Sequence, residues 1–258
     1  MLRALLDLSG RVALISGGSR GLGLQIAEAL GEFGATLALV ARREEELAEA
    51  VRHLAERNIR AAPIAADLAD PAAAETVAAR TLALAGRIDI LVNNAGAAWG
   101  APAESHPLDA WRKVIDLNLT GTFLLTQAVG RAAMLPAGAG RILNIASIEG
   151  FRGRPPGMPG TIAYATSKGG MISFTRSLAA EWGPRGITVN AIAPGFFPSK
   201  MTRGTLERFG ADLLARTPLG KLGGPHDLKG AALLFASDAG GHITGQVLAI
   251  DGGASSIL

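Results

Sequence analysis

The chain contains no cysteine and a single tyrosine, and aromatic residues make up only 5% of its 258 positions. Without cysteine it can form no disulfide, no thiolate metal site and no cysteine nucleophile. It has no uninterrupted apolar run of about 18 residues, the length that a membrane-spanning helix needs. The N-terminal residues turn acidic at Asp7, too early for a signal peptide. These absences predict a cytoplasmic protein that does not enter a membrane.

Charge is also sparse: charged residues account for 18% of the sequence and hydrophobic residues for 48%, with a net charge of +3. This balance indicates a globular protein. The arginines are scattered, and no basic run alternates with aromatic residues, so we expect no nucleic-acid partner. The four histidines stand at spacings that predict no metal site: His53, His106, His226 and His242. The length fits one α/β domain spanning residues 1–258.

Short aliphatic runs alternate with alanine-rich stretches along the whole chain. We expect strands at 12–16, 36–40, 62–65, 88–92, 141–146, 188–192 and 247–250, and helices at 22–33, 44–57, 72–85 and 111–134. The strands are apolar throughout, as in sheets covered on both faces. The predicted fold class is therefore α/β: a doubly wound, Rossmann-like parallel sheet of seven strands, with helices on both faces. Segments 151–160 and 194–204 are predicted to be loops near strand ends.

A glycine-rich segment follows the first predicted strand and precedes the first long helix. Glycines allow a tight turn there and let the backbone approach a pyrophosphate, while the helix N-terminus offers free N–H groups and the positive end of its dipole. This strand–loop–helix context predicts nucleotide binding. The loop residues expected to bind the cofactor are Gly17, Ser19, Arg20, Gly21, Leu22 and Gly23.

The second predicted strand ends at Arg42 and Arg43, and no acid appears until Glu44. Enzymes that bind NAD usually have an acid here for the ribose hydroxyl, whereas arginine suits a 2′-phosphate. Arg20 offers a second guanidinium from the glycine loop. The alternative is that Arg42 and Arg43 are merely solvated. The pattern favours NADP(H) over NAD(H).

The only tyrosine, Tyr164, precedes Lys168 by four residues, which places the phenol and the ammonium on one helix face. A nearby cation favours the phenolate and lowers the phenol's pKa, so that it could exchange protons near neutral pH. The pair alone could equally belong to an ordinary surface helix.

Several motifs occur in the order found in one family. These are Asn93-Asn94-Ala95-Gly96 after the fourth strand, Asn118, Ser147 at the end of the fifth strand, Tyr164 with Lys168, and Pro194-Gly195 after the sixth strand. Over almost its whole length the chain resembles the short-chain dehydrogenase/reductase family, in its NADP-preferring short branch. The Ser147–Tyr164 gap is longer than is usual in that family.

The resemblance implies a set of roles. Tyr164 would exchange a proton with a carbonyl or alcohol oxygen, and Ser147 would hydrogen-bond that oxygen. Lys168 would bind the nicotinamide ribose and lower the tyrosine's pKa, while Asn118 would bend its helix and hold a proton-relaying water. The remaining cofactor contacts implied are Asp67, Leu68, Asn94, Ala95, Gly96, Ile192, Pro194, Gly195, Phe197 and Ser199, with Tyr164 and Lys168 themselves.

Three functions remain open on the sequence. The first is an NADPH-dependent reductase of 3-oxoacyl thioesters carried on acyl-carrier protein or CoA, because the chain, and in particular its run 194–202, resembles 3-oxoacyl-carrier-protein reductases. An acidic carrier protein or its phosphopantetheine could meet the basic residues Arg152, Arg154, Lys200 and Arg203. The second is a dehydrogenase of sugar acids or polyols, such as gluconate, whose carboxylate the same arginines could bind. The third, remote alternative is a non-catalytic dinucleotide sensor. The resemblance further implies a homo-oligomer, a tetramer or a dimer, with the helices at 111–134 and 164–182 in one interface.

Overall fold

The computed structural model describes residues 1–154 and 157–257. One parallel sheet forms its centre, in the order β3-β2-β1-β4-β5-β6-β7. The strands are β1 (Val12–Ser16), β2 (Thr36–Ala41), β3 (Ala61–Ala65), β4 (Ile90–Asn93), β5 (Gly140–Ile145), β6 (Ile187–Pro194) and β7 (Val247–Ile250). All six pairings are parallel. The predicted seven-stranded, Rossmann-like sheet is confirmed.

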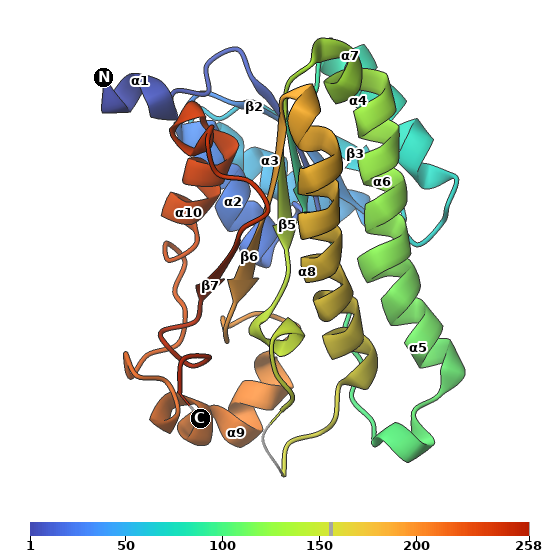
Figure 1. The fold of residues 1–258 in the computed structure, drawn as a ribbon, viewed down its shortest axis with the longest axis vertical. Helices are drawn as coiled ribbons and strands as arrows, with labels where there is room; N and C mark the ends of the chain where they lie inside the picture. The colour runs from blue at the N-terminus through green and yellow to red at the C-terminus, as the bar shows by residue number, and fades with distance from the viewer. Residues whose placement is uncertain (155–156, 258) are drawn as a thin grey trace.

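Helices pack on both faces of this sheet (Figure 1). One face carries α2 (Gly21–Glu32), α3 (Glu44–Ala55) and α10 (Lys229–Ala236), and the other carries α4 (Ala73–Ala85), α6 (Thr122–Val129) and α8 (Ile162–Trp182). Neighbouring residues of one strand pack into the cores on opposite faces of the sheet: Ile15 packs toward α2, while Leu14 packs toward α4. This is why the strands are apolar at every position instead of alternating.

The strand order reverses between β1 and β4, which start the two halves of the sheet. In doubly wound folds this reversal opens a crevice at the carboxyl ends of the strands, where ligands bind. The helix α9 (Arg203–Ala215) lies at that end of the sheet (Figure 1). The remaining elements are short: α1 (Leu2–Leu6), η1 (Ala103–Ser105), η4 (Ile148–Gly150), η5 (Gly183–Arg185) and η6 (Asp238–Gly240).

The long helix predicted at 111–134 begins earlier and is interrupted twice. It starts as α5 (Leu108–Ile115), widens into a π segment, η2 (Asp116–Gly121), and returns to α-geometry in α6. A second π segment, η3 (Gly130–Met134), leads into α7 (Leu135–Ala137). Both π segments contain a glycine at a point of close packing. A Cβ on Gly121 would collide with the carbonyl oxygen of Leu68, and one on Gly130 would collide with the Trp182 ring.

The predicted loops are partly right. Of segment 151–160, positions 155 and 156 lie outside the described residues, and the others form turns, bends and irregular chain. In segment 194–204, β6 includes Pro194 and α9 already begins at Arg203. The helices α9 and α10 were not predicted. No helix in the described part of the chain is long and apolar enough to cross a membrane.

Candidate active site

The glycine loop folds as its sequence predicts. Gly17 and Gly21 both adopt positive φ, at 64° and 57°, which only glycine does without strain. Gly23 sits against the loop itself, since a Cβ there would collide with the carbonyl oxygen of Gly17. No side chain of the described residues caps the N-terminus of α2. Its first N–H groups therefore remain available to a phosphate at the mouth of the loop.

The loop is held in place by Ser16 and Asn94. The Nδ2 of Asn94 donates to the carbonyl oxygens of Ser16, at 3.0 Å, and Gly17, at 2.9 Å. The Ser16 hydroxyl accepts from the backbone N–H of Asn94, at 3.0 Å, and of Ala95, at 3.1 Å. Loop and β4 thus form one rigid wall, and Asn94 supports the glycine turn as well as facing the cleft.

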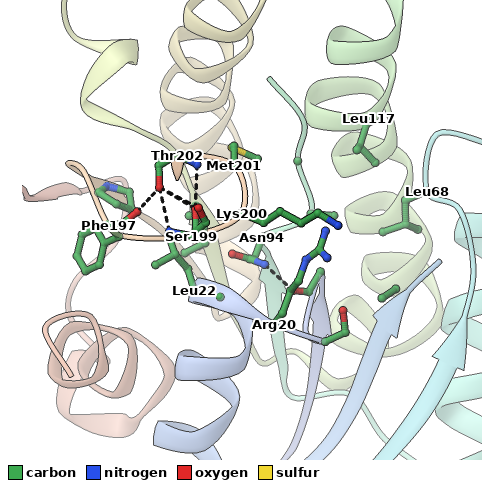
Figure 2. A pocket seen from close by; sticks show the side chains of 18 of the residues that line it. Arg20, Leu22, Leu68, Asn94, Leu117, Phe197, Ser199, Lys200, Met201 and Thr202 are labelled. Atoms are coloured by element: carbon green, nitrogen blue, oxygen red, sulfur yellow. Dashed lines mark hydrogen bonds between the residues drawn. The ribbon is translucent and has the colours of Figure 1, made fainter. Parts of the chain in front are cut away.

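A cleft of about 670 Å³ opens at this wall (Figure 2). The predicted cofactor residues that line it are Gly17, Ser19, Arg20, Gly21, Leu22, Arg42, Asp67, Leu68, Asn94, Ala95, Gly96, Tyr164, Lys168, Pro194, Gly195, Phe197 and Ser199. Gly23 is outside this lining, because it packs beneath the turn. Ile192 is also outside this lining, with its side chain buried in the core that α2 covers, and its expected place beside the nicotinamide stays a prediction.

One end of the cleft is rich in arginine. Arg20, Arg42 and Arg43 all line it, together with Glu46 from the first turn of α3. The Oε1 of Glu46 accepts from Arg20 at 2.8 Å and from Arg43 at 3.3 Å. Arg42 lies 4.0 Å from Asp67 and is 64% exposed. Glu46 was not predicted, because an acid that contacts the cofactor was expected only at the end of β2.

Figure 2 shows the segment after β6, with Phe197, Ser199 and Thr202, on the other side of the cleft from Leu68 and Leu117. There the Thr202 hydroxyl donates to the carbonyl oxygen of Phe197, at 2.6 Å, and lies 3.0 Å from the Ser199 hydroxyl. The Ser199 N–H donates to the same Thr202 oxygen, at 2.9 Å. This turn fixes the hydroxyl of Ser199 at the cleft wall. Thr202 itself was not predicted.

Lys168 is buried, at 4% exposure, and its Nζ donates to the carbonyl oxygen of Ile145 at 2.6 Å. That nitrogen lies 5.6 Å from the centre of the Tyr164 ring. Burial lowers the pKa of Lys168 from 10.5 to about 8. The expected juxtaposition of phenol and ammonium is therefore present, one helical turn apart on α8.

The expected shift in the tyrosine pKa is not found. Burial, and next the carboxylate of Glu149, raise the pKa of Tyr164 from 10.0 to about 12. The hydroxyl of Ser147 and the guanidinium of Arg154 act in the opposite direction without prevailing. The spacing of Tyr164 and Lys168 in the sequence shows the cation, but neither the burial of the phenol nor the nearby charge of Glu149.

Asn118 lies fully buried in the π segment η2. Its Oδ1 accepts from the Ala97 N–H at 2.7 Å, and its Nδ2 donates to the Ala97 carbonyl oxygen at 2.9 Å and to the Ser167 hydroxyl at 3.0 Å. The Ser167 hydroxyl in turn donates to the Tyr164 carbonyl oxygen at 2.7 Å. The side chain therefore ties the chain after β4 to α8, just beneath Tyr164.

A buried network that was not predicted supports the same region. Asn93 donates to the Thr126 hydroxyl at 2.9 Å and to the Asn144 amide oxygen at 2.8 Å. Asn144 donates to the Thr175 hydroxyl at 2.9 Å. These bonds lock together β4, β5, α6 and α8. The sequence signal for this network is Asn93, the first of the two asparagines in the motif at 93–96. Only the second, Asn94, had been predicted to have a role.

A second cavity, of about 420 Å³, adjoins the cleft. Its walls combine aromatic side chains, among them Trp99, Phe196 and Phe209, with the charged residues Glu149, Arg154 and Arg208. Five residues line both spaces: Ser147, Tyr164, Gly195, Met201 and Thr202. The predicted catalytic hydroxyls therefore stand where the two spaces meet.

The doubly wound α/β fold and the glycine-lined cleft at its strand ends are those of a dinucleotide-binding protein. A family model described as enoyl-(acyl carrier protein) reductase matches residues 17–255. The chain is 37% identical over 251 residues to gluconate 5-dehydrogenase of Gluconobacter oxydans, covering 96% of both chains. It is 40% identical over 254 residues to the rhamnolipid-biosynthesis 3-oxoacyl-[acyl-carrier-protein] reductase of Pseudomonas aeruginosa, covering 96% of this chain and 97% of that one.

A crystal structure of a gluconate 5-dehydrogenase from Burkholderia cenocepacia, in complex with NADP and tartrate, superposes with a TM-score of 0.94. It is 36% identical and the match covers 100% of both chains. The chain belongs to the short-chain dehydrogenase/reductase family and is an oxidoreductase. The predicted NADP(H) cofactor is confirmed at the level of the family and its solved relatives, and the cleft fits it: a glycine cradle at one helix N-terminus and arginines at the far end.

Proposed function

We propose that this enzyme reduces a ketone to a secondary alcohol with NADPH, and that Tyr164 supplies the proton. The observation that carries the proposal is the position of Ser147 and Tyr164 at the junction of the two cavities. A substrate carbonyl placed between these two hydroxyls would face the cofactor in the cleft, while the rest of the substrate would occupy the second cavity. NADPH supplies the hydride when bound.

In this proposal Tyr164 donates its proton to the carbonyl oxygen as negative charge develops there. With its pKa raised to about 12, the phenol is protonated at neutral pH and so has a proton to donate. The hydroxyl of Ser147 stabilises the same oxygen. Lys168 offers an ammonium in the cleft wall for a ribose hydroxyl, and Asn118 holds α8 against the chain after β4.

The choice of NADP(H) over NAD(H) is assigned to the arginine-rich end of the cleft. Arg42 offers an exposed guanidinium, and Arg20 and Arg43 stand beside it. A 2′-phosphate would gain charge-assisted hydrogen bonds from these groups. Glu46 draws Arg20 and Arg43 toward its own carboxylate, so Arg42 is the residue on which we expect the preference to depend most.

The first substrate candidate is a 3-oxoacyl thioester on acyl-carrier protein or CoA. The apolar wall formed by Trp99, Phe196 and Phe209 suits an acyl chain. Several relatives of this chain carry the name 3-oxoacyl-[acyl-carrier-protein] reductase, including one from Escherichia coli that is 38% identical.

A sugar acid is the second candidate, favoured by Arg208 on the wall of the same cavity and by the gluconate dehydrogenases among the relatives. Arg208 stacks on Phe209, with 5.0 Å between its guanidinium carbon and the ring centre. Its guanidinium could bind a substrate carboxylate.

One assay separates the two candidates: NADPH oxidation followed by absorbance, with an acetoacetyl thioester in one arm and 5-ketogluconate in the other. Turnover of the thioester alone supports the first candidate. Turnover of the sugar acid alone removes it in favour of the second. A non-catalytic dinucleotide sensor would turn over neither, although Tyr164 and Lys168 are both in place here.

Assembly into a homo-oligomer also belongs to this proposal. Large apolar side chains are exposed on the helices predicted to meet in an interface: Leu108, Phe123 and Ile162 are 58%, 46% and 43% exposed. Their burial between subunits would be favourable. A cytoplasmic location stays a prediction.

A further inference from the structure

Beside Tyr164, the carboxylate of Glu149 accepts two hydrogen bonds and forms an ion pair. The Oε1 of Glu149 accepts from the Nε of Arg154 at 2.8 Å and forms an ion pair with its Nη2 at 2.6 Å. The Oε2 accepts from the Thr161 hydroxyl at 2.6 Å. The side chains of Glu149 and Arg154 are only 10% and 16% exposed. Both residues line the second cavity.

The three residues come from three points of the chain around the predicted catalytic hydroxyls. The Glu149 N–H donates to the hydroxyl of Ser147, at 3.2 Å, in the short helix η4. Thr161 precedes the first residue of α8, and its carbonyl oxygen accepts from Ala165 at 2.9 Å. Arg154 also donates to the carbonyl oxygen of Pro159 at 3.2 Å. The carboxylate thus links the end of β5 to the start of the helix that carries Tyr164.

Such a pair costs desolvation, which its hydrogen bonds only partly return, so a gain in stability is a weak reason for its presence. Positioning of the residues around Tyr164 explains the ion pair better. The carboxylate holds Arg154 and Thr161 on the cavity wall, and all three face the same space as Tyr164.

We propose that Glu149 is a positioning residue: its carboxylate fixes Arg154 and Thr161 around Tyr164 and so sets the wall against which the substrate lies. The proposal rests on the proposed function and adds a residue that its chemistry does not include. Glu149 also acts on Tyr164 electrostatically, because its negative charge lies close enough to interact with the phenol.

The charged groups around the phenol come from three elements. Glu149 and Arg154 lie on η4 and the segment after it, Lys168 lies on α8, and Arg208 lies on α9 across the cavity. After burial, Glu149 contributes most to raising the pKa of Tyr164, and Arg154 opposes it. Removing the negative charge while keeping the arginine should therefore let the phenol ionise at lower pH.

Because Tyr164 is the only tyrosine, its ionisation can be followed directly by near-ultraviolet absorbance of the phenolate, without substrate or cofactor. Wild type and Glu149→Gln are titrated over the pH range in which both keep native far-ultraviolet circular dichroism. We expect a larger phenolate fraction in Glu149→Gln at the top of that range, equivalent to a shift of about one pH unit. Equal phenolate fractions in the two proteins, including none in either, would overturn the electrostatic part.

Steady-state kinetics on the better substrate of the two-arm assay tests the positioning part. Glu149→Gln should raise KM about tenfold while kcat changes less, and Glu149→Asp, which keeps the charge, should recover the wild-type titration. Thr161→Val removes one donor and no charge, so it should raise KM without moving the titration. Thr161→Val also tests the positioning role if Glu149→Gln fails to fold. Unchanged KM in the variants that fold contradicts the positioning role.

The matched control is Glu75→Gln, which removes a carboxylate paired with Arg131 on an exposed surface, at 64% exposure of Glu75. It should leave both titration and KM unchanged. If wild type turns over no carbonyl substrate, the proposed function fails, while the titration still decides whether Glu149 acts on the phenol.

Discussion

At the scale of the residue, the pair formed by Tyr164 and Lys168 is governed by burial. Removing both groups from water favours their neutral forms, so the phenol's pKa rises to about 12 while the ammonium's falls to about 8. A neutral phenol can donate a proton. The lowered pKa of Lys168 means that keeping this side chain charged in the folded protein costs free energy of folding. That cost should be visible as a pH dependence of stability.

Lys168→Met tests it. Between pH 8 and 10.5 the unfolded wild-type chain holds more protons at this position than the folded one, so wild-type stability relative to the variant should rise with pH across this window. The expected gain is about 3 kcal/mol. Urea unfolding at several pH values measures it, with Lys113→Met as the exposed control. A difference that stays constant across the window would show that Lys168 keeps its ordinary pKa in the folded protein.

The cofactor preference also belongs to single residues. Arg42→Ala should raise KM for NADPH about tenfold or more and leave KM for NADH nearly unchanged, because only NADPH carries the 2′-phosphate. The measurement is initial rate against each cofactor, with Arg112→Ala, on α5 away from the cleft, as the control. An equal rise in KM for NADPH and NADH would mean that Arg42 does not bind the 2′-phosphate.

How much of the site could be predicted differs from residue to residue. Tyr164, Ser147 and the glycine loop were predictable because motif spacing fixes their place at strand and helix ends. Glu46 and Glu149 were not, because their importance depends on which side chains meet across chain segments: Glu46 meets Arg20, 26 positions away, and Glu149 meets Thr161. The direction of the Tyr164 pKa shift failed for the same reason.

At the scale of the element, the glycine loop and α2 act as a unit. A methyl group at Gly23 would push against the Gly17 carbonyl and against the Asn94 side chain that holds the turn. The ends of the strands were predicted to within two residues, because buried parallel strands have continuous apolar runs. The π segments were not, since they depend on packing of Gly121 and Gly130 against distant groups.

Gly23→Ala should therefore weaken NADPH binding about tenfold, since overpacking of one methyl group costs about 1–3 kcal/mol and must be relieved by moving the loop. Fluorescence titration with NADPH checks this. Gly210→Ala, in α9, is the control because a Cβ there meets no atom within 4 Å. Wild-type affinity in Gly23→Ala would mean that the loop tolerates a Cβ.

At the scale of the whole molecule, exposed apolar side chains on α5, α6 and α8 remain to be accounted for. Phe123 packs edge-on against Phe174, with 6.5 Å between ring centres, yet is 46% exposed. We expect wild type to run as a tetramer or dimer in size-exclusion chromatography with light scattering, and Phe123→Glu to shift it toward smaller species. A monomeric wild type at micromolar concentration would contradict the assembly.

The central claim is that one phenol, at the meeting point of the cofactor cleft and the substrate cavity, supplies the proton. Tyr164→Phe removes the hydroxyl alone, so it tests this claim most directly. We predict a loss of kcat of about a thousandfold, within the range for general acid catalysis, with NADPH binding by fluorescence unchanged. Turnover at the wild-type rate in Tyr164→Phe would contradict the account.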